Sequence, residues 1–367
     1  MKFQIDRETL LAPLSHLMGV VEKRQTMPIL SNVLMRLTDD TLEMTATDTE
    51  VQLVARVGTS PGEPGEVTVP ARKLLDIFRL LPDQSRVNLG LKGDRLTVQA
   101  GSSRFSLTTL PVESYPAFDM GQTDLEVTLP APTLRTALEK TLFAIAQQDV
   151  RYYLKGLLLD LEGVTLRTVA SDGHRLAVFQ ETLAEGFAAN RQIIVPRKGV
   201  LELYRLLNDA ADEVTLQISP NTLRANIGSL SFSTKLIDGR YPDYRRVLPQ
   251  ECATTILVER DLLRSALGRV GLMTNEKQKS ISLDASANGD MILTSQSADQ
   301  DDAEERLSVR AEGGAVSVGF NSAYLIEAIS HVSGSELRLS FTPAGNSCLV
   351  EDPDDPRYRC VVMPMRL

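Results

Sequence analysis

The sequence predicts an α+β protein made of three tandem repeats, each with two helices and several short antiparallel strands. The first observation behind this prediction is a stretch that returns along the chain, at residues 69–83, 195–209 and, more faintly, 320–330. The copies align on an acidic residue and lie 126 and 125 positions apart, so the 367 residues come close to three such periods. The second observation is a helical pattern ahead of each copy, and the third is a hairpin pattern after it.

Each period begins with a segment in which apolar residues recur every three or four positions, as at Leu10, Leu14 and Leu17. The returning stretch has the same spacing and forms a second helix in each period. These patterns predict six helices, at residues 6–24, 71–83, 132–151, 196–209, 259–279 and 321–331.

Strands are predicted where apolar and polar residues alternate. Two such runs flank a short polar turn after each second helix, which predicts hairpins at residues 87–100, 214–227 and 337–350. The apolar pattern is interrupted by Gly, Gln and Asp near residue 121 and by Cys-Ala-Thr near residue 252. We therefore expect three domains, at residues 1–122, 127–250 and 254–367.

Composition narrows the class of protein. A chain of 367 residues is too long for one core, and 43% hydrophobic residues are enough for several. The N-terminus has no apolar run typical of a signal peptide, and no stretch approaches the ~20 apolar residues of a membrane span. Cys252, Cys348 and Cys360 lack metal-ligand spacing. We expect reduced, buried cysteines, no metal or other cofactor, no membrane partner and a cytoplasmic location.

Charge is distributed unevenly. The formal net charge is −9, which taken alone argues against binding to nucleic acid. The six predicted helices nevertheless carry a net charge of +4, which leaves −13 for the rest of the chain. This distribution favours a basic helical surface within an acidic protein.

Eight short motifs occur in order along nearly the whole chain: Lys2-Phe3, Pro28-Ile-Leu30, Val69-Pro-Ala-Arg-Lys73, Gln148-Asp-Val-Arg-Tyr-Tyr153, Ala170-Ser-Asp-Gly-His-Arg-Leu176, Val195-Pro-Arg-Lys-Gly199, Asp238-Gly-Arg-Tyr-Pro-Asp-Tyr-Arg-Arg-Val-Leu248 and Val361-Val-Met-Pro-Met-Arg-Leu367. Any one of them is weak, but together they are specific. The chain resembles the bacterial DNA polymerase III beta subunits, the sliding clamps, from end to end.

The resemblance implies three tandem repeats of the DNA-clamp fold, with helices lining a ring and antiparallel sheets outside. It implies a non-catalytic processivity factor, a head-to-tail homodimer that encircles double-stranded and primed DNA. The implied partners are the DNA polymerase III alpha subunit, the clamp loader, and other polymerases and repair proteins with clamp-binding peptides. The width of a helix, ~10 Å, agrees with a dimer. The six helices of one copy in a circle would leave a hole of only ~9 Å, and the twelve of two copies would leave ~28 Å. A DNA duplex is ~20 Å across, so only the dimer could enclose it.

The resemblance also implies three sets of site residues. Those expected to contact DNA are Arg24, Arg72, Gln148, Tyr152 and Tyr153. Those expected at the dimer interface are Phe105, Leu272 and Met273. A hydrophobic pocket for partner peptides is expected from Leu154, Ser171, Gly173, His174, Arg175, Leu176, Pro242, Arg246, Val247, Asn321, Tyr324, Ser347, Val361, Val362, Met363, Pro364, Met365 and Arg366.

The residue types in this sequence are also compatible with two other functions. Ser171, Asp172 and His174 are the residue types of a hydrolytic triad, so a hydrolase using Asp172 and His174 is one alternative. Neighbours in one turn cannot form a triad, however, because alternate side chains point apart. The other alternative is a monomeric peptide-binding scaffold, since an apolar C-terminus with two methionines must either pack or bind.

Overall fold

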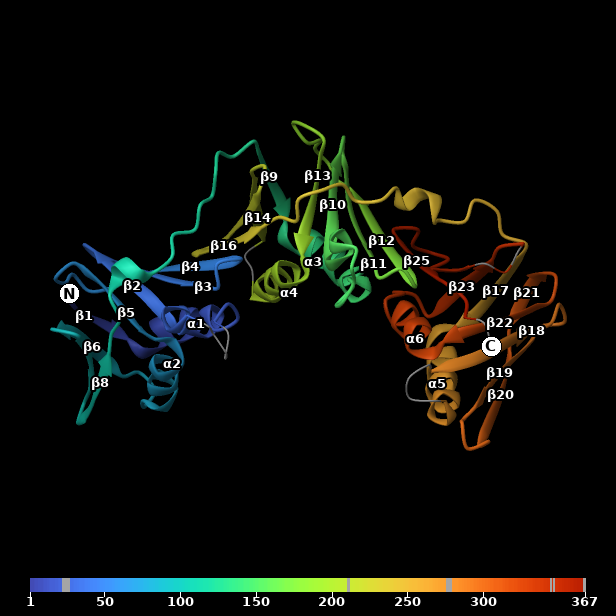
Figure 1. Cartoon of the computed structure of the whole chain (residues 1–367), viewed down its shortest axis with the longest axis horizontal. Coiled ribbons are helices and arrows are strands. Elements are labelled where there is room, and N and C mark those ends of the chain that lie inside the picture. The colour runs from blue at the N-terminus through green and yellow to red at the C-terminus, as the bar shows by residue number, and fades with distance from the viewer. Residues whose placement is uncertain (22–26, 210–211, 275–278, 344, 346, 366–367) are drawn as a thin grey trace. The chain divides into compact units, whose positions relative to one another are not determined.

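The computed structural model in Figure 1 describes residues 1–21, 27–209, 212–274, 279–343, 345 and 347–365. The chain divides into two compact units, each of which draws on two segments. Unit 1 consists of Met1–Arg135 and Lys198–Leu236, and unit 2 of Thr136–Arg197 and Ile237–Leu367.

Unit 1 contains two antiparallel sheets. The larger has eight strands in the order β5 (Gly65–Pro70), β2 (Asn32–Thr38), β3 (Thr41–Thr47), β4 (Val51–Gly58), β16 (Leu230–Lys235), β15 (Thr222–Ile227), β14 (Glu213–Ile218) and β9 (Leu125–Pro130). The smaller has four strands in the order β1 (Lys2–Asp6), β6 (Arg86–Lys92), β7 (Arg95–Ala100) and β8 (Ser103–Thr108).

Unit 2 repeats this plan. Its larger sheet has nine strands in the order β13 (Arg191–Pro196), β10 (Gly156–Glu162), β11 (Thr165–Ser171), β12 (Arg175–Thr182), β25 (Tyr358–Val362), β24 (Cys348–Glu351), β23 (Glu336–Phe341), β17 (Thr254–Glu259) and β21 (Arg310–Gly313). The smaller sheet has the order β20 (Asp302–Ser308), β19 (Asp290–Gln296), β18 (Ser280–Ala285) and β22 (Val316–Asn321).

Helices pack on these sheets through one apolar face. Helix α1 (Arg7–Leu17) buries Leu10, Leu14 and Leu17, one stripe at helical spacing. The other α-helices are α2 (Ala71–Leu80), α3 (Ala131–Glu139), α4 (Arg197–Leu206), α5 (Arg260–Val270) and α6 (Ser322–Ser330). Helices α1 and α2 lie side by side, as do α5 and α6 (Figure 1). Short 3-10 turns are η1 (Pro28–Ser31), η2 (Val112–Ser114), η3 (Leu142–Ala144), η4 (Tyr152–Lys155), η5 (Leu207–Asp209), η6 (Tyr244–Arg246) and η7 (Gly271–Met273).

The helices are shorter than the apolar spacing predicts. The segment 132–151 was expected to be one helix, but α3 ends at Glu139. The Ala137 carbonyl accepts hydrogen bonds from the hydroxyls of Thr141 and Thr168, at 2.9 and 2.7 Å. The Thr141 backbone amide, which would donate to this carbonyl in a continuing helix, donates to the Leu138 carbonyl. Because side-chain donors satisfy this carbonyl, the chain can leave the helix at no hydrogen-bonding cost.

Each large sheet runs across a joint between repeats. At the first joint β4 pairs with β16, and Leu53 lies opposite Phe232. At the second joint β12 pairs with β25, and Leu176 lies opposite Val361. Each joint therefore holds two neighbouring repeats together through backbone hydrogen bonds, and it places the loops of both repeats beside the same strands.

The expectation for the cysteines is partly wrong. Cys348 and Cys360 are buried free thiols, but Cys252 is exposed because it lies in the segment between repeats rather than on a strand. Within the described parts of the chain, no group of three or more His, Cys, Asp or Glu side chains could hold a metal ion. None of the described helices is long and apolar enough to span a membrane.

Candidate binding pocket at the second joint

The turn between β11 and β12 forms one wall of a pocket, and its own side chains hold it in shape. The Asp172 carboxylate accepts from the backbone amides of His174 and Arg175, at 2.9 and 3.0 Å. The Ser171 hydroxyl donates to the Arg175 carbonyl at 2.8 Å. Gly173 has φ of +86°, and a Cβ there would lie 2.5 Å from the Arg151 guanidinium. Glycine is therefore favoured here by the backbone conformation, since the flexible Arg151 side chain could move away from a Cβ.

The C-terminal strand forms the second wall. Strand β25 pairs with β12 along its length, and the Met363 amide then donates to the His174 carbonyl at 2.8 Å. Val361 is fully buried, whereas Met363 is only partly buried and lies at the edge of the same apolar cluster. The apolar tail is thus both a core strand and part of an exposed binding surface.

These walls enclose a cavity of about 240 Å³. Apolar and aromatic side chains dominate its lining, with Arg151, Ser171, Arg175 and Asp243 as the polar members. Burial raises the pKa of the Tyr241 and Tyr244 phenols, so both are neutral around pH 7. The cavity is lined by Arg151, Tyr153, Leu154, Ser171, Gly173, Arg175, Leu176, Tyr241, Pro242, Asp243, Tyr244, Val247 and Met363.

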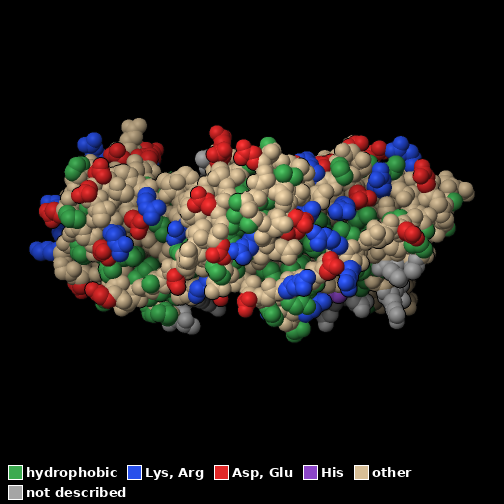
Figure 2. Space-filling view, turned by 90° about the horizontal axis from the view of Figure 1, so that it is seen from above, with side chains coloured by type: hydrophobic (Ala, Val, Ile, Leu, Met, Phe, Trp, Pro, Cys, Tyr) green, Lys and Arg blue, Asp and Glu red, His purple; other side chains and the backbone are tan. Residues whose placement is uncertain are grey.

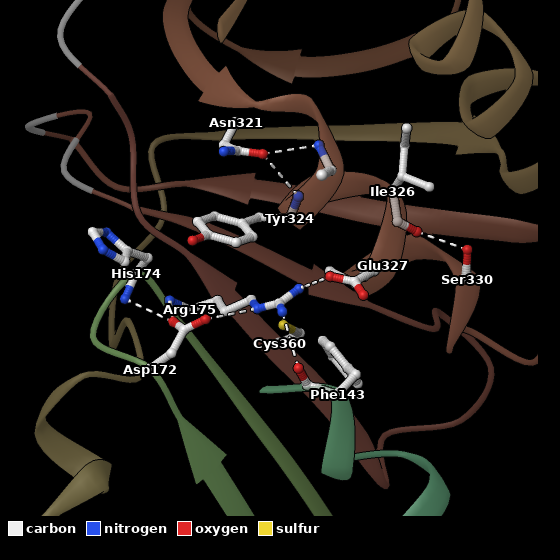
Figure 3. A network of polar contacts seen from close by, with 12 residues as sticks. Phe143, Asp172, His174, Arg175, Asn321, Tyr324, Ile326, Glu327, Ser330 and Cys360 are labelled. Atoms are coloured by element: carbon white, nitrogen blue, oxygen red, sulfur yellow. Dashed lines mark hydrogen bonds and ion pairs between the residues drawn. The ribbon is translucent and has the colours of Figure 1, made fainter. Parts of the chain in front are cut away.

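Arg175 connects the turn to the third repeat (Figure 3). Its guanidinium pairs with Asp172 at 3.1 Å and with Glu327 of α6, and it donates to the Phe143 carbonyl at 2.9 Å. It also lies over the Tyr324 ring, 4.6 Å from the centroid. Burial alone would lower the pKa of Arg175, but the ion pairs with Glu327 and Asp172 outweigh it and raise that pKa. Arg175 is therefore a permanently charged anchor for the pocket wall.

Replacing Arg175 by methionine is expected to lower the free energy of unfolding by about 2–3 kcal/mol. The Arg175 side chain is only 7% exposed, and its loss removes the guanidinium from Asp172, Glu327 and the Phe143 carbonyl, while Asp172 keeps its two backbone donors. Urea unfolding measures the change. Arg246→Met is the control, because the Arg246 side chain is 85% exposed and its loss should change stability by less than about 0.5 kcal/mol. Equal stability of the two variants would contradict the anchoring role.

Eight of the residues expected in the pocket line this cavity, and five others were missed: Arg151, Tyr153, Tyr241, Asp243 and Tyr244. The repeated Tyr-Pro sequence, at residues 115–116 and 241–242, was the available signal for Tyr241. Arg246 points to solvent, whereas Ser347 and Val362 are buried. Asn321 caps α6 by accepting from the amides of Ala323 and Tyr324. Pro364 and Met365 follow the strand outside the cavity, and Arg366 lies outside the described residues.

His174 and Tyr324 line a neighbouring cavity of about 380 Å³, together with Gln148, Asp149 and Arg151 among others. The His174 and Tyr324 rings stack with centroids 5.7 Å apart. Arg151 holds the pKa of the Asp149 carboxyl down at about 2 through a side-chain hydrogen bond. This second cavity is polar and shares Arg151 and Arg175 with the first, so the two form one elongated surface.

The geometry does not support a hydrolase. The Ser171 hydroxyl donates to a backbone carbonyl, and Asp172 is bound to two amides and to Arg175. The His174 ring faces Tyr324 rather than either of them (Figure 3). Among the described residues, neither Asp172 nor His174 is therefore positioned to act as a base for Ser171.

Of the residues expected to contact DNA, Arg72, Gln148 and Tyr152 are exposed, Tyr153 is partly buried, and Arg24 lies outside the described residues. Arg72 is exposed in the first turn of α2. Gln148 is exposed, and Tyr152 is 55% exposed. Tyr153 instead packs on the apolar cluster of the pocket, with its ring edge-on to Tyr152. Arg197, at the start of α4, has a buried Nε with no hydrogen-bond partner in the part of the chain that the structure describes.

The helices remain basic when their observed bounds are used. The net charges of α1 to α6 are 0, +2, 0, +2, +2 and −1, a total of +5 within a chain of −9. On the face shown in Figure 2, by contrast, acidic and basic side chains are interspersed with apolar ones. Positive charge is thus a property of the helices rather than of every surface.

The residues expected at a dimer interface lie near two sheet edges. Phe105 is 37% exposed on β8, the edge strand of the small sheet of unit 1. Leu272 and Met273 are 77% and 39% exposed in η7, which contacts β19 beside the edge strand β20. The opposite edges of these sheets, β1 and β22, are covered by isolated bridges to Glu63 and Met365.

Known proteins resemble this chain over its whole length. Family models of the DNA polymerase III beta subunit match its N-terminal domain to residues 1–119, its central domain to 128–243 and its C-terminal domain to 245–366. The beta sliding clamp of Vibrio cholerae is 46% identical and that of Escherichia coli K12 is 43% identical, each with 100% of both chains covered.

Solved structures agree with these sequence matches. The DNA polymerase III subunit beta from Pseudomonas aeruginosa superposes with a TM-score of 0.96 at 42% identity, over 100% of both chains. A sliding clamp from the same organism, solved bound to griselimycin, has the same TM-score and identity. The Caulobacter crescentus beta sliding clamp gives a TM-score of 0.95 at 36% identity.

Proposed function

Because the chain belongs to the family of bacterial DNA polymerase III beta subunits, the sliding clamps, we propose that two copies close head to tail into a ring around duplex DNA. The chain is a non-catalytic processivity subunit, and the ring would slide along DNA and tether the polymerase. The observation that carries this proposal is the tandem match of three clamp domains over residues 1–366. We propose domains at residues 1–122, 127–250 and 254–367, and a cytoplasmic location.

Two unprotected sheet edges support the head-to-tail contact. An edge strand presents unpaired N–H and C=O groups that can pair with another chain. Strand β8 carries the exposed Arg104 and Phe105, and β20 carries Asp302 and Glu304. Pairing β8 of one copy with β20 of the next would join opposite charges and would bury Phe105 near Leu272. Because the two edges differ, the contact is heterologous, and two such contacts can close a ring.

The helices supply the surface that would face DNA. Their net charge of +5 favours the phosphate backbone without reading base sequence. We propose that Arg72 and Arg197 donate to phosphates, and that Gln148 and Tyr152 contact the backbone or an unpaired base. Arg24 and Tyr153 remain predicted contacts. A modest charge suits sliding, because each strong phosphate contact would add ~0.9 to the salt slope and slow the movement.

The pocket at the second joint would bind short peptides of partner proteins. Its cavity of about 240 Å³ is lined mainly by apolar and aromatic side chains with a few polar groups, which suits apolar side chains of a peptide. The griselimycin-bound clamp structure is consistent with a ligand site in this family. We propose the DNA polymerase III alpha subunit, the clamp loader, and other polymerases and repair proteins as the partners.

Retention on DNA tests the ring. The protein is loaded by a clamp loader onto nicked circular DNA, washed in high salt, and the DNA is then cut. A closed ring is expected to remain on the circle and to leave the linear form within seconds to minutes, because nothing but topology holds it. Loss from both forms in high salt would show ordinary electrostatic binding. A monomer that binds peptides but is not retained on circular DNA would favour the monomeric peptide-binding scaffold instead.

A further inference from the structure

The first joint contains a groove that corresponds to the pocket of the second joint. It is a cavity of about 440 Å³ on the large sheet of unit 1, under the segment 112–118. In both places a Tyr-Pro pair, at residues 115–116 and 241–242, covers the strands at the joint. The Tyr115 hydroxyl donates to the Thr45 carbonyl at 2.9 Å, which fixes this cover on β3.

The strand registers show that the two sites differ in chemistry at matching positions. At the second joint, Leu176, Val361 and Leu349 form one row across β12, β25 and β24. At the first joint, the same row across β4, β16 and β15 is Gln52, Ser233 and Arg224. Three apolar side chains are thus replaced by an amide, a hydroxyl and a guanidinium. Of the apolar row only Leu176 lines the cavity at the second joint, whereas Gln52, Ser233 and Arg224 all line the groove at the first.

Among the arginines that line this groove, Arg224 makes no ion pair in the part of the chain that the structure describes. Arg36 pairs with Glu66 at 2.9 Å, and Arg56 pairs with Glu43 at 2.8 Å. The Nε of Arg224, in contrast, is buried and has no hydrogen-bond partner within the described residues. A buried donor without a partner is costly, and a carboxylate is the group that a guanidinium binds best.

We propose that the groove at the first joint is a second docking site, which takes an acidic peptide segment of a partner protein. An Asp or Glu side chain of the peptide would pair with Arg224. The neighbouring Gln52 and Asn226 offer side-chain amides for the peptide backbone, although the Asn226 oxygen already accepts from Ser231, and Phe118 offers an apolar contact. The size of the groove favours a peptide over a small anion, because 440 Å³ is in the range of sites that enclose several groups.

Binding of a defined probe tests this site independently of ring formation. The probe is a dye-labelled, acetylated and amidated Ser-Glu-Asp-Glu-Ser peptide, with Ser-Gln-Asn-Gln-Ser as its neutral counterpart. Fluorescence anisotropy on the full chain is expected to give a dissociation constant below 1 mM for the acidic peptide and no binding of the neutral one. Arg224→Gln should weaken binding at least tenfold, and Arg224→Lys should restore part of it.

Two variants serve as controls. Arg86→Gln removes an arginine that is 74% exposed on another strand of unit 1, and Val247→Asp alters the pocket of the second joint. Both should bind the acidic peptide as the unaltered chain does, and thermal unfolding checks that every variant is folded. The proposal is overturned if the acidic peptide does not bind, if Arg224→Gln binds it equally, if Val247→Asp abolishes binding, or if inorganic phosphate binds the groove more tightly than the peptide.

Discussion

Replacing Leu272 by aspartate is expected to abolish retention on circular DNA while leaving the chain folded. Leu272 is 77% exposed in the single chain, so a carboxylate there is tolerated in the monomer. In the proposed ring the same position is buried against the edge strand β8 of the next copy. An uncompensated carboxylate in that contact costs at least about 3 kcal/mol, which is roughly a hundredfold in the dissociation constant.

A ring of two copies has two identical contacts, so the aspartate is expected to weaken both of them. Sedimentation should show a monomer at concentrations where the unaltered chain is dimeric, and the retention assay should show no protein on the washed circle. Val164→Asp is the control, since Val164 is 43% exposed in the turn before β11, away from both edge strands in the sequence. A Leu272→Asp chain that still dimerises and stays on the circle would rule out η7 as part of the interface.

The sequence predicts the repeats, the class of fold and the elements of each repeat, because these follow from local periodicity. It also predicts a structural turn at Asp172 and Gly173, because these residue types are typical of turns. The structure confirms this turn, with Asp172 bound to two amides. It likewise confirms that the C-terminal run packs and remains partly open, with Val361 buried and Met363 at the pocket edge.

What could not be predicted depends on contacts between distant residues. The end of α3 is fixed by Thr168, which reaches the Ala137 carbonyl from another element. Glu327 pairs with Arg175 across 152 positions, and a repeat alignment gives no reason to connect them. The row that contains Arg224 becomes visible only when the strand registers are known. Local patterns contain no information on such register, so the shape of both joint sites had to come from the structure.

Replacing Val247 by aspartate is expected to abolish ligand binding at the second joint. Val247 lines the mouth of the cavity and is 37% exposed, so the folded chain tolerates the change. A ligand that fills the apolar cavity would have to cover the new carboxylate, and the desolvation costs about 2–4 kcal/mol. Griselimycin is a suitable probe, because a related clamp binds it, and its affinity should fall by roughly thirtyfold to a thousandfold.

Calorimetry measures this affinity without DNA or a clamp loader, so the result is independent of ring closure. The matched change Val164→Asp adds the same carboxylate to an exposed valine of the same unit outside the cavity, and it should leave the affinity unchanged. Leu272→Asp should also bind the probe normally, because Leu272 does not line the cavity. If Val247→Asp binds griselimycin as tightly as the unaltered chain, the cavity at the second joint is not the ligand site. If Leu272→Asp loses binding as well, the site instead needs both copies of the ring.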